Sequence, residues 1–136
     1  MGGNAYVDSS ALLKLAFVED ETHALEAALA QRALVSSRLT RVECGRALGR
    51  ETRRQAILTL DQLLESVYLV DIGTPMVDRA VTLSPVVLRS LDAIHVATAL
   101  SLADPDLAFV TYDQRMADAA RANGLTVVQP GRPASA

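Results

Sequence analysis

Four acidic residues lie next to apolar segments or near the starts of predicted helices, where a charged side chain requires a structural or chemical explanation. Asp8 ends the apolar run AYV near the N-terminus, and Asp113 follows the run AFVTY. Glu43 lies in the first turns of a predicted helix, LTRVECGRAL, and Asp92 lies near the start of SLDAIHVATAL, which is apolar nearly all the way round. In an open parallel sheet, the carboxyl ends of strands and the N-termini of helices gather at one edge, where ligands bind. We therefore expect these four acids to converge on one cleft.

Such a cluster needs a cation, because neighbouring carboxylates repel one another and raise one another's pKa values. The chain has a single lysine, Lys14, and its arginines lie elsewhere along the sequence, so no side chain is an evident partner. A ligand set made only of carboxylate oxygens suits Mg²⁺ or Mn²⁺ and does not suit zinc, which prefers Cys and His. Metal ions held in this way activate a water and stabilise the charge that develops on a phosphodiester.

Each acid also has a structural explanation that involves no metal. Asp8 and Asp113 are good helix N-caps, since a short carboxylate accepts a backbone N–H that the first turn leaves unpaired. Thr40 and Glu43 have the spacing of a capping box, in which Glu43 reaches back to the start of its own helix. Asp92 is the least easily explained as a cap, because its helix is expected to begin before it. A carboxylate at the edge of an apolar helix is costly without a partner.

Other polar side chains lie close to these acids in the sequence. Ser9 and Thr111 flank two of the acids and can orient them or a bound water, although both also suit ordinary helix and strand positions. His95 lies one turn after Asp92 and could contact a phosphate, but a single histidine in an apolar helix is more often packed and hydrogen-bonded. Cys44 has no histidine at a spacing that would activate it, so we expect it to be buried packing.

Strand-like and helical segments alternate along the chain. This alternation predicts an α/β fold in which a central parallel sheet of about five strands is covered by helices on both faces. The expected strands are 5–8, 33–36, 67–72, 107–112 and 125–129, and the expected helices are 9–17, 21–32, 38–49, 52–66, 75–83, 89–103 and 114–123.

The composition bounds the class of protein. A chain of 136 residues, half of them hydrophobic, predicts one domain over residues 1–136, with its core at about 4–129 and a frayed tail at 130–136. A single cysteine, no evident leader and no apolar run long enough to span a bilayer predict a cytoplasmic protein without a membrane partner. Aromatic residues make up only 4 % of the chain and the net charge is −3, which argues against a base-stacking platform and against a general nucleic-acid coat.

Positive charge is concentrated in one stretch of the sequence, the same stretch that carries Glu43. If its helix is continuous, Arg46, Arg50 and Arg53 share a face and can form a track for phosphates beside the metal site. The alternative is an ordinary solvated helical face. The six arginines of this stretch are Arg38, Arg41, Arg46, Arg50, Arg53 and Arg54.

Four sequence blocks together resemble the PIN-domain family, and within it the VapC toxins of bacterial toxin–antitoxin pairs. They are YVDSSALLKL, LTRVEC, SLDAIHVATAL and FVTYDQRMADAA, in that order and at that spacing, and the resemblance spans about residues 4–129. It implies that Asp8, Glu43, Asp92 and Asp113 form the family's acidic quartet for divalent metal. Ser9 and Thr111 match positions that support this site.

The same resemblance implies an activity and partners. A protein of this kind is expected to be a Mg²⁺- or Mn²⁺-dependent endoribonuclease that acts on RNA as a homodimer. A small VapB-type antitoxin is expected to inhibit it by laying a segment over the active groove. The residues that choose the RNA target lie in surface loops without a readable code.

Other functions remain open at this point. A phosphatase of the haloacid type needs a second Asp two residues after the first, where this chain has Ser10, and a phosphotransfer receiver needs a late Lys, whereas Lys14 is early. A catalytically silent binding module is a different kind of alternative, in which the acidic cleft holds an Arg-bearing partner peptide. Metal-dependent turnover separates this alternative from the nuclease.

Overall fold

The fold is built on a five-stranded parallel sheet. A computed structural model describes residues 3–48 and 53–133, with the backbone alone for Arg53. The strands lie in the order β3-β2-β1-β4-β5, and every neighbouring pair is parallel. Their bounds are Asn4–Val7 for β1, Ala33–Ser37 for β2, Val67–Val70 for β3, Ala108–Val110 for β4 and Thr126–Val128 for β5.

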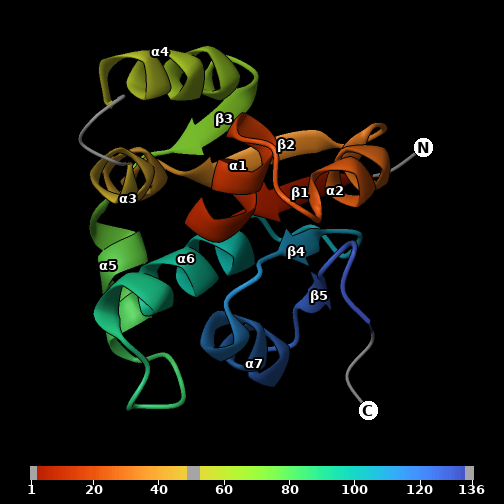
Figure 1. The fold of residues 1–136 in the computed structure, drawn as a ribbon. Coiled ribbons are helices and arrows are strands. Elements are labelled where there is room, and N and C mark those ends of the chain that lie inside the picture. Colours follow the sequence, from red (N-terminus) through yellow and green to blue (C-terminus); the bar gives the residue numbers. More distant parts are fainter. Residues whose placement is uncertain (1–2, 49–52, 134–136) are drawn as a thin grey trace.

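Helices cover both faces of this sheet (Figure 1). One face is covered by α1 (Ser9–Ala16), α2 (Thr22–Leu29), α3 (Leu39–Ala47) and α4 (Arg53–Leu64). The other face is covered by α5 (Thr74–Val81), α6 (Ser90–Ser101) and α7 (Gln114–Ala122). The predicted α/β architecture is thus confirmed. None of these helices is long and apolar enough to cross a membrane.

The central strands are apolar throughout because each of their faces is buried. In β1, Ala5 and Val7 point into the core under α1–α4, whereas Tyr6 points into the core under α6 and α7. Strand β4 alternates in the same way, with Phe109 stacked on Tyr6 at a ring-centroid distance of 5.2 Å. A strand buried on both sides reads as a continuous apolar run rather than as an alternating one.

The topology changes direction at β1. The chain first builds outward through β2 and β3, then crosses to the other side of β1 to form β4 and β5. The carboxyl ends of β1 and β4 therefore lie at the switch point of the sheet, which is where open α/β sheets bind ligands. Asp8 and Asp113 follow these two strands. The backbone N–H of Asp8 donates to the carbonyl of Val110 at 3.2 Å, so the two strand ends are joined directly.

The condition for a phosphate track along the arginine-rich stretch, a single continuous helix, is not met. Helix α3 ends at Ala47, and Leu48 has extended backbone, so residues 38–54 do not form the continuous helix on which the phosphate track was based. Arg53 instead begins the separate helix α4. Arg50 lies outside the described residues.

The start of the C-terminal tail is held rather than frayed. The hydroxyl of Tyr112 donates to the carbonyl of Pro130 at 2.6 Å, and Nη1 of Arg132 donates to the carbonyl of Tyr112 at 2.8 Å. The Arg132 guanidinium also pairs with Glu21 at 3.2 Å and lies 4.9 Å from the centre of the Tyr112 ring. These contacts hold residues 130–133 against the domain. Residues 134–136 lie outside the described part of the chain.

Candidate active site

Asp8 is both a helix cap and a buried carboxylate at the switch point. Its side chain is 2 % exposed, and Oδ1 accepts the N–H of Ala11 at 3.0 Å, which caps α1. Oδ1 also accepts the hydroxyl of Ser10 at 2.6 Å, and Oδ2 accepts the hydroxyl of Thr111 at 2.5 Å. Burial raises the pKa of Asp8, although these hydrogen bonds oppose the shift. The cap explains its position in the helix but leaves an acceptor site on Oδ2.

Ser10 makes the hydroxyl contact that was expected near Ser9. Its Oγ donates to Asp8 and accepts the N–H of Tyr112 at 2.9 Å, which ties the start of α1 to the end of β4. The hydroxyl of Ser9 makes no hydrogen bond to a residue in the described ranges. The backbone carbonyl of Ser9 accepts the thiol of Cys44 at 3.7 Å. The phase of the first helical turn decides which of two adjacent serines faces the acid, and the sequence does not fix that phase.

Thr111 links Asp8 to Asp113. Its side chain is fully buried; it donates to Asp8 and accepts the backbone N–H of Asp113 at 3.1 Å. Asp113 is exposed and caps α7, with Oδ1 accepting the N–H of Arg115 at 2.9 Å and of Met116 at 3.4 Å. One buried hydroxyl thus joins the carboxylate of Asp8 to the backbone of Asp113, more than one hundred residues away in the sequence.

Glu43 is held by a buried histidine. Its Oε1 lies 2.5 Å from Nε2 of His95, and Nδ1 of His95 lies 2.6 Å from the hydroxyl of Tyr6. His95 and Tyr6 are fully buried, whereas Glu43 is partly exposed. A carboxylate only accepts hydrogen bonds when ionised, so Nε2 carries the proton that points at Glu43. In neutral His95, the Tyr6 hydroxyl then donates to Nδ1. His95 is packed and hydrogen-bonded, as a histidine in an apolar helix usually is.

The capping box considered for Glu43 does not form. The hydroxyl of Thr40 pairs with that of Ser36 at 2.6 Å, and the first N–H of α3, that of Leu39, is accepted by Ser37 at 3.1 Å. Ser36 in turn donates to the carbonyl of Val7. The side chain of Glu43 is therefore free of its own helix start and is directed to His95.

Asp92 completes the set from the first turn of α6, where it is partly buried. Burial raises its pKa, the charge of Asp113 raises it further, and a smaller contribution in the same direction comes from Glu43. The charges of His95 and Arg89 act in the opposite sense. Asp113 and Glu43 therefore lie within electrostatic reach of Asp92, and the formation of one site by all four acids stays a prediction.

The donor set fits a hard divalent ion by its chemistry. All four side chains offer carboxylate oxygens, which Mg²⁺ and Mn²⁺ prefer, and two of them have a raised pKa that a nearby cation would lower. Among the described residues, no three acidic, histidine or cysteine side chains are already drawn together as a ready-made metal cage. Magnesium sites commonly use few protein carboxylates and keep several waters, so a closed cage is not required.

A PIN-domain family model matches residues 5–122 of this chain. The chain belongs to the PIN-domain family. Among curated proteins it is similar to two ribonucleases of Mycobacterium tuberculosis. Ribonuclease VapC46 is 42 % identical over 92 % of this chain and 96 % of its own length, and ribonuclease VapC47 is 35 % identical over 93 % and 96 %. This similarity over nearly the full length places this PIN-domain protein among the VapC ribonucleases.

Solved structures agree on the fold. The chain superposes on VapC20 of Mycobacterium tuberculosis, described as a sarcin-ricin loop cleaving toxin, with a TM-score of 0.72 and 15 % identity, covering 93 % of this chain and 100 % of that one. It superposes on VapBC2 of Rickettsia felis, solved with a promoter DNA fragment, with a TM-score of 0.72 and 12 % identity, covering 93 % and 98 %. At these identities the likeness concerns the PIN fold.

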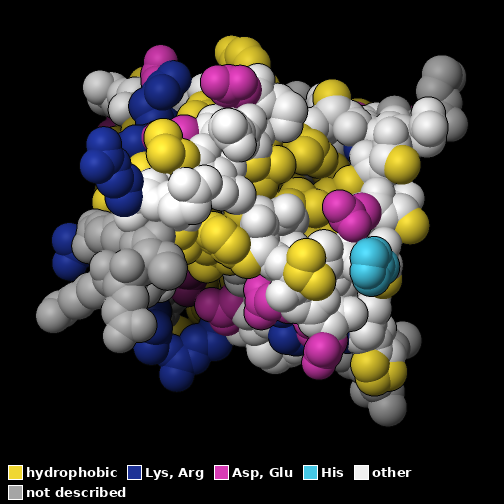
Figure 2. All heavy atoms as spheres, turned by 45° about the horizontal axis from the view of Figure 1, so that its top comes forward, with side chains coloured by type: hydrophobic (Ala, Val, Ile, Leu, Met, Phe, Trp, Pro, Cys, Tyr) yellow, Lys and Arg dark blue, Asp and Glu magenta, His cyan; other side chains and the backbone are white. Residues whose placement is uncertain are grey.

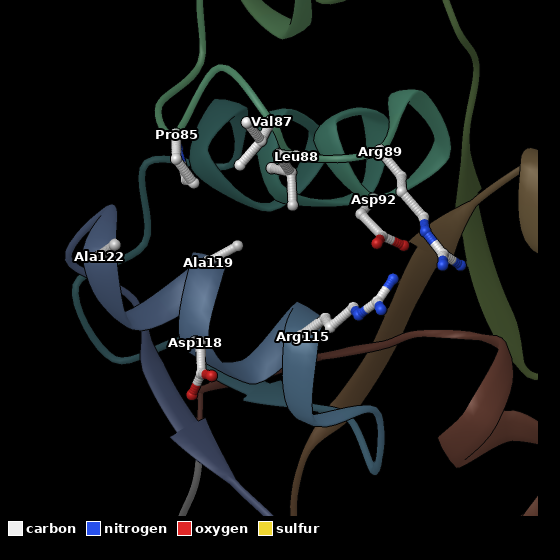
Figure 3. A pocket seen from close by; sticks show the side chains of 9 residues that line it. All are labelled: Pro85, Val87, Leu88, Arg89, Asp92, Arg115, Asp118, Ala119 and Ala122. Atoms are coloured by element: carbon white, nitrogen blue, oxygen red, sulfur yellow. The ribbon is translucent and has the colours of Figure 1, made fainter.

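Two arginines that we did not predict lie beside the acids of this PIN domain. Arg89 directly precedes α6 and Arg115 follows Asp113 in α7, and both guanidinium groups extend toward the same end of a cavity as Asp92 (Figure 3). Arg89 lowers the pKa of Asp92 through its charge, although neither arginine forms an ion pair with Asp92 among the described residues. The spacing contained a signal, since each arginine lies within three residues of a quartet member.

The arginine-rich stretch is only partly available to a ligand. Arg38 pairs with Asp71 at 2.5 Å, and Arg41 pairs with Asp61 at 3.0 Å. Arg46 is exposed at the end of α3. Figure 2 shows Lys and Arg side chains gathered along the left side of the molecule, in the region of α3 and α4. Arg54 is exposed as well, whereas the side chains of Arg50 and Arg53 lie outside the described residues. A role for these six arginines in RNA binding stays a prediction.

Proposed function

We propose that this VapC-family chain is the toxin of a toxin–antitoxin pair and acts as a metal-dependent endoribonuclease. The observation that carries the proposal is the buried link at the ends of the paired strands β1 and β4, in which the Thr111 hydroxyl donates to the Asp8 carboxylate and accepts the backbone N–H of Asp113. A second buried side chain, His95, holds Glu43 at the same edge of the sheet. The family relationship supports the substrate class, because the similar curated proteins are named ribonucleases.

Asp8, Glu43, Asp92 and Asp113 are the residues that would hold Mg²⁺ or Mn²⁺. When bound, such an ion supplies a water of lowered pKa and neutralises charge on the phosphodiester and its leaving oxygen. The chain supplies the positions of the ligands: Thr111 fixes Asp8, and His95 fixes Glu43. This chemistry does not use the 2′-hydroxyl as nucleophile, so the expected products carry 5′-phosphate and 3′-hydroxyl ends.

The proposed partners follow from the same family. A VapB-type antitoxin would cover the acidic groove, and the active unit would be a homodimer in the cytoplasm. The structural neighbour from Rickettsia felis is a VapBC pair, which supports an antitoxin as the partner.

The test is cleavage of total cellular RNA by the purified, antitoxin-free protein in Mn²⁺ or Mg²⁺. The controls are EDTA, an Asp8→Asn variant and an Asp20→Asn variant, since Asp20 is exposed and lies outside the quartet. Discrete cleavage by wild type and Asp20→Asn, absent with EDTA and with Asp8→Asn, supports the proposal. Cyclic-phosphate ends, or cleavage that persists in EDTA, would contradict it. Metal binding without turnover on any RNA would favour the silent binding module.

A further inference from the structure

A cavity of about 500 Å³ opens directly beside Asp92. It lies between the loop that joins α5 to α6 and the facing side of α7 (Figure 3). Pockets that bind small molecules or single chemical groups typically measure about 300–1,000 Å³. The cavity is thus large enough to receive part of a substrate that is being held at the acidic quartet. Its apolar walls are formed by Pro85, Val87, Leu88, Ala119 and Ala122.

The apolar wall is exposed but is held in place. Val87 is 89 % exposed, although removing an apolar side chain from water is favourable in free energy. The loop that carries it is joined to the C-terminal end of α7, because Nδ2 of Asn123, which directly follows α7, donates to the carbonyl of Ser84 at 2.8 Å. A ligand would therefore meet walls that are already spaced apart.

The charged side chains that line the cavity point in different directions according to their sign. Arg89 and Arg115 extend toward the end of the cavity at which Asp92 lies, whereas the carboxylate of Asp118 points away from it (Figure 3). Asp118 is occupied by the side-chain amide of Gln114 at 2.8 Å. Within the described ranges, neither Arg89 nor Arg115 forms an ion pair. The arginines that do form ion pairs are Arg38, Arg41, Arg121 and Arg132.

We propose that this cavity receives one unpaired base of the RNA, with a phosphate next to that base bound by Arg89 and Arg115. The inference rests on the proposed ribonuclease function, because it places the bound nucleotide against Asp92. Proteins that read RNA sequence commonly do so by taking an unstacked base into a pocket and by stacking or pairing it with side chains. Arginine suits the phosphate, since its planar guanidinium can bind two oxygens at once.

A segment of another protein fits the cavity less well. An apolar side chain would match the walls but would leave both arginines without an anion. A nucleotide satisfies both parts, because its base is flat and largely apolar on its faces and its phosphate is negative. The cavity would then select which nucleotide lies beside the cleaved bond, so it would contribute to the choice of cleavage site.

The test measures binding in the Asp8→Asn background, in which the RNA should stay intact. The probe is a fluorescein-labelled single-stranded RNA of about ten nucleotides, within the range of common single-strand sites, and a matched set in which each position in turn is abasic. Binding is followed by fluorescence anisotropy at several salt concentrations. The cavity variants are Ala122→Trp, which fills the space, Val87→Asp, which makes one wall polar, and Arg115→Ala. The control variant is Val18→Asp, an exposed valine far from the cavity in the sequence.

One abasic position should weaken binding to the Asp8→Asn protein roughly tenfold, which is the affinity that burial of one apolar group contributes. Ala122→Trp and Val87→Asp should remove this difference, and Val18→Asp should retain it. Arg115→Ala should lower the slope of log K against log salt by about 0.7, the value for one phosphate contact on a single strand. Each variant is checked by thermal unfolding, and Ala122 and Val87 are both exposed, so folding should be retained.

An abasic penalty that survives in both cavity variants overturns the inference, and so does a salt slope that Arg115→Ala leaves unchanged. These outcomes leave wild-type cleavage of total RNA intact. Absence of cleavage by the wild type counts instead against the proposed function. The two failures are therefore distinguishable.

Discussion

His95 holds Glu43 from inside the protein, with Nε2 2.5 Å from Oε1 of the carboxylate. The histidine is fully buried, and its other nitrogen is bound to the hydroxyl of Tyr6 on the central strand β1. The rotation of the ring is therefore fixed at both ends. Glu43, a residue of the predicted metal set, thus depends for its position on the strand that directly precedes another member, Asp8.

This relationship predicts the effect of removing the histidine. His95→Ala should reduce Mn²⁺ affinity and RNA cleavage by about 10- to 100-fold, the usual cost of losing a partner that orients a metal ligand. His95→Gln should recover part of the loss, because its amide N–H can still donate to Glu43. Mn²⁺ titration followed by calorimetry measures the affinity, and circular dichroism verifies the fold. Equal affinity in wild type and His95→Ala would show that the contact has no role at the site.

A second prediction concerns Thr111, whose hydroxyl bridges Asp8 and Asp113. Thr111→Val keeps the shape but removes the bridge, so cleavage should fall by about 10- to 100-fold, whereas Thr111→Ser should retain most of the activity. Thr98→Val is the matched control, since Thr98 is equally buried and its hydroxyl donates only to the Ile94 carbonyl in its own helix. If Thr111→Val and Thr98→Val reduce cleavage equally, the hydrogen bonds of the Thr111 hydroxyl have no specific role in activity.

A third prediction follows from the raised pKa of Asp8, which is caused first by burial. Folded protein binds the Asp8 proton more tightly than unfolded protein. The free energy of unfolding of the metal-free protein should therefore fall as the pH rises from the unfolded pKa of Asp8 through its raised folded pKa. Asp8→Asn cannot ionise, so in EDTA it should be more stable than wild type at neutral pH, and this difference should shrink in acid.

Urea denaturation in EDTA at neutral and acidic pH measures this difference. Mn²⁺ should then stabilise wild type at neutral pH and leave Asp8→Asn nearly unchanged, because only the carboxylate attracts the ion. Wild type that is more stable than Asp8→Asn in EDTA at neutral pH would contradict the expected sign.

A fourth prediction concerns Cys44. Burial, followed by the charges of Glu43 and Asp8, raises the pKa of its thiol to about 12, so little thiolate is present at neutral pH. Iodoacetamide should label native protein far more slowly than urea-unfolded protein, as measured by mass spectrometry. Rapid labelling of the native protein would mean that this region of α3 opens readily.

Much of this site could be predicted from the sequence because strand ends and helix starts mark it. Asp8 and Asp113 were identifiable because each directly follows a short apolar run, and parallel pairing then brings those runs together. The alternation of elements was sufficient for the five-stranded α/β fold. Asp92 was identifiable because a carboxylate in so apolar a helix requires an explanation.

The remaining features depend on tertiary structure. The contact between Glu43 and His95 joins residues more than fifty positions apart, and no local pattern encodes it. Arg115 reaches the cavity only because the first turn of α7 faces α6. The two helices expected over 38–49 and 52–66 are observed as α3 and α4, so Arg46 and Arg53 belong to different helices.

The most direct test of the central claim is whether the four carboxylates form one divalent-ion site. Mn²⁺ binding would be measured by isothermal titration calorimetry, without RNA or antitoxin, for wild type, Asp8→Asn and Asp20→Asn. We expect wild type and Asp20→Asn to bind the ion alike and Asp8→Asn to lose most of the binding. Equal binding by all three proteins would contradict the account, because Asp8 would then not be a ligand.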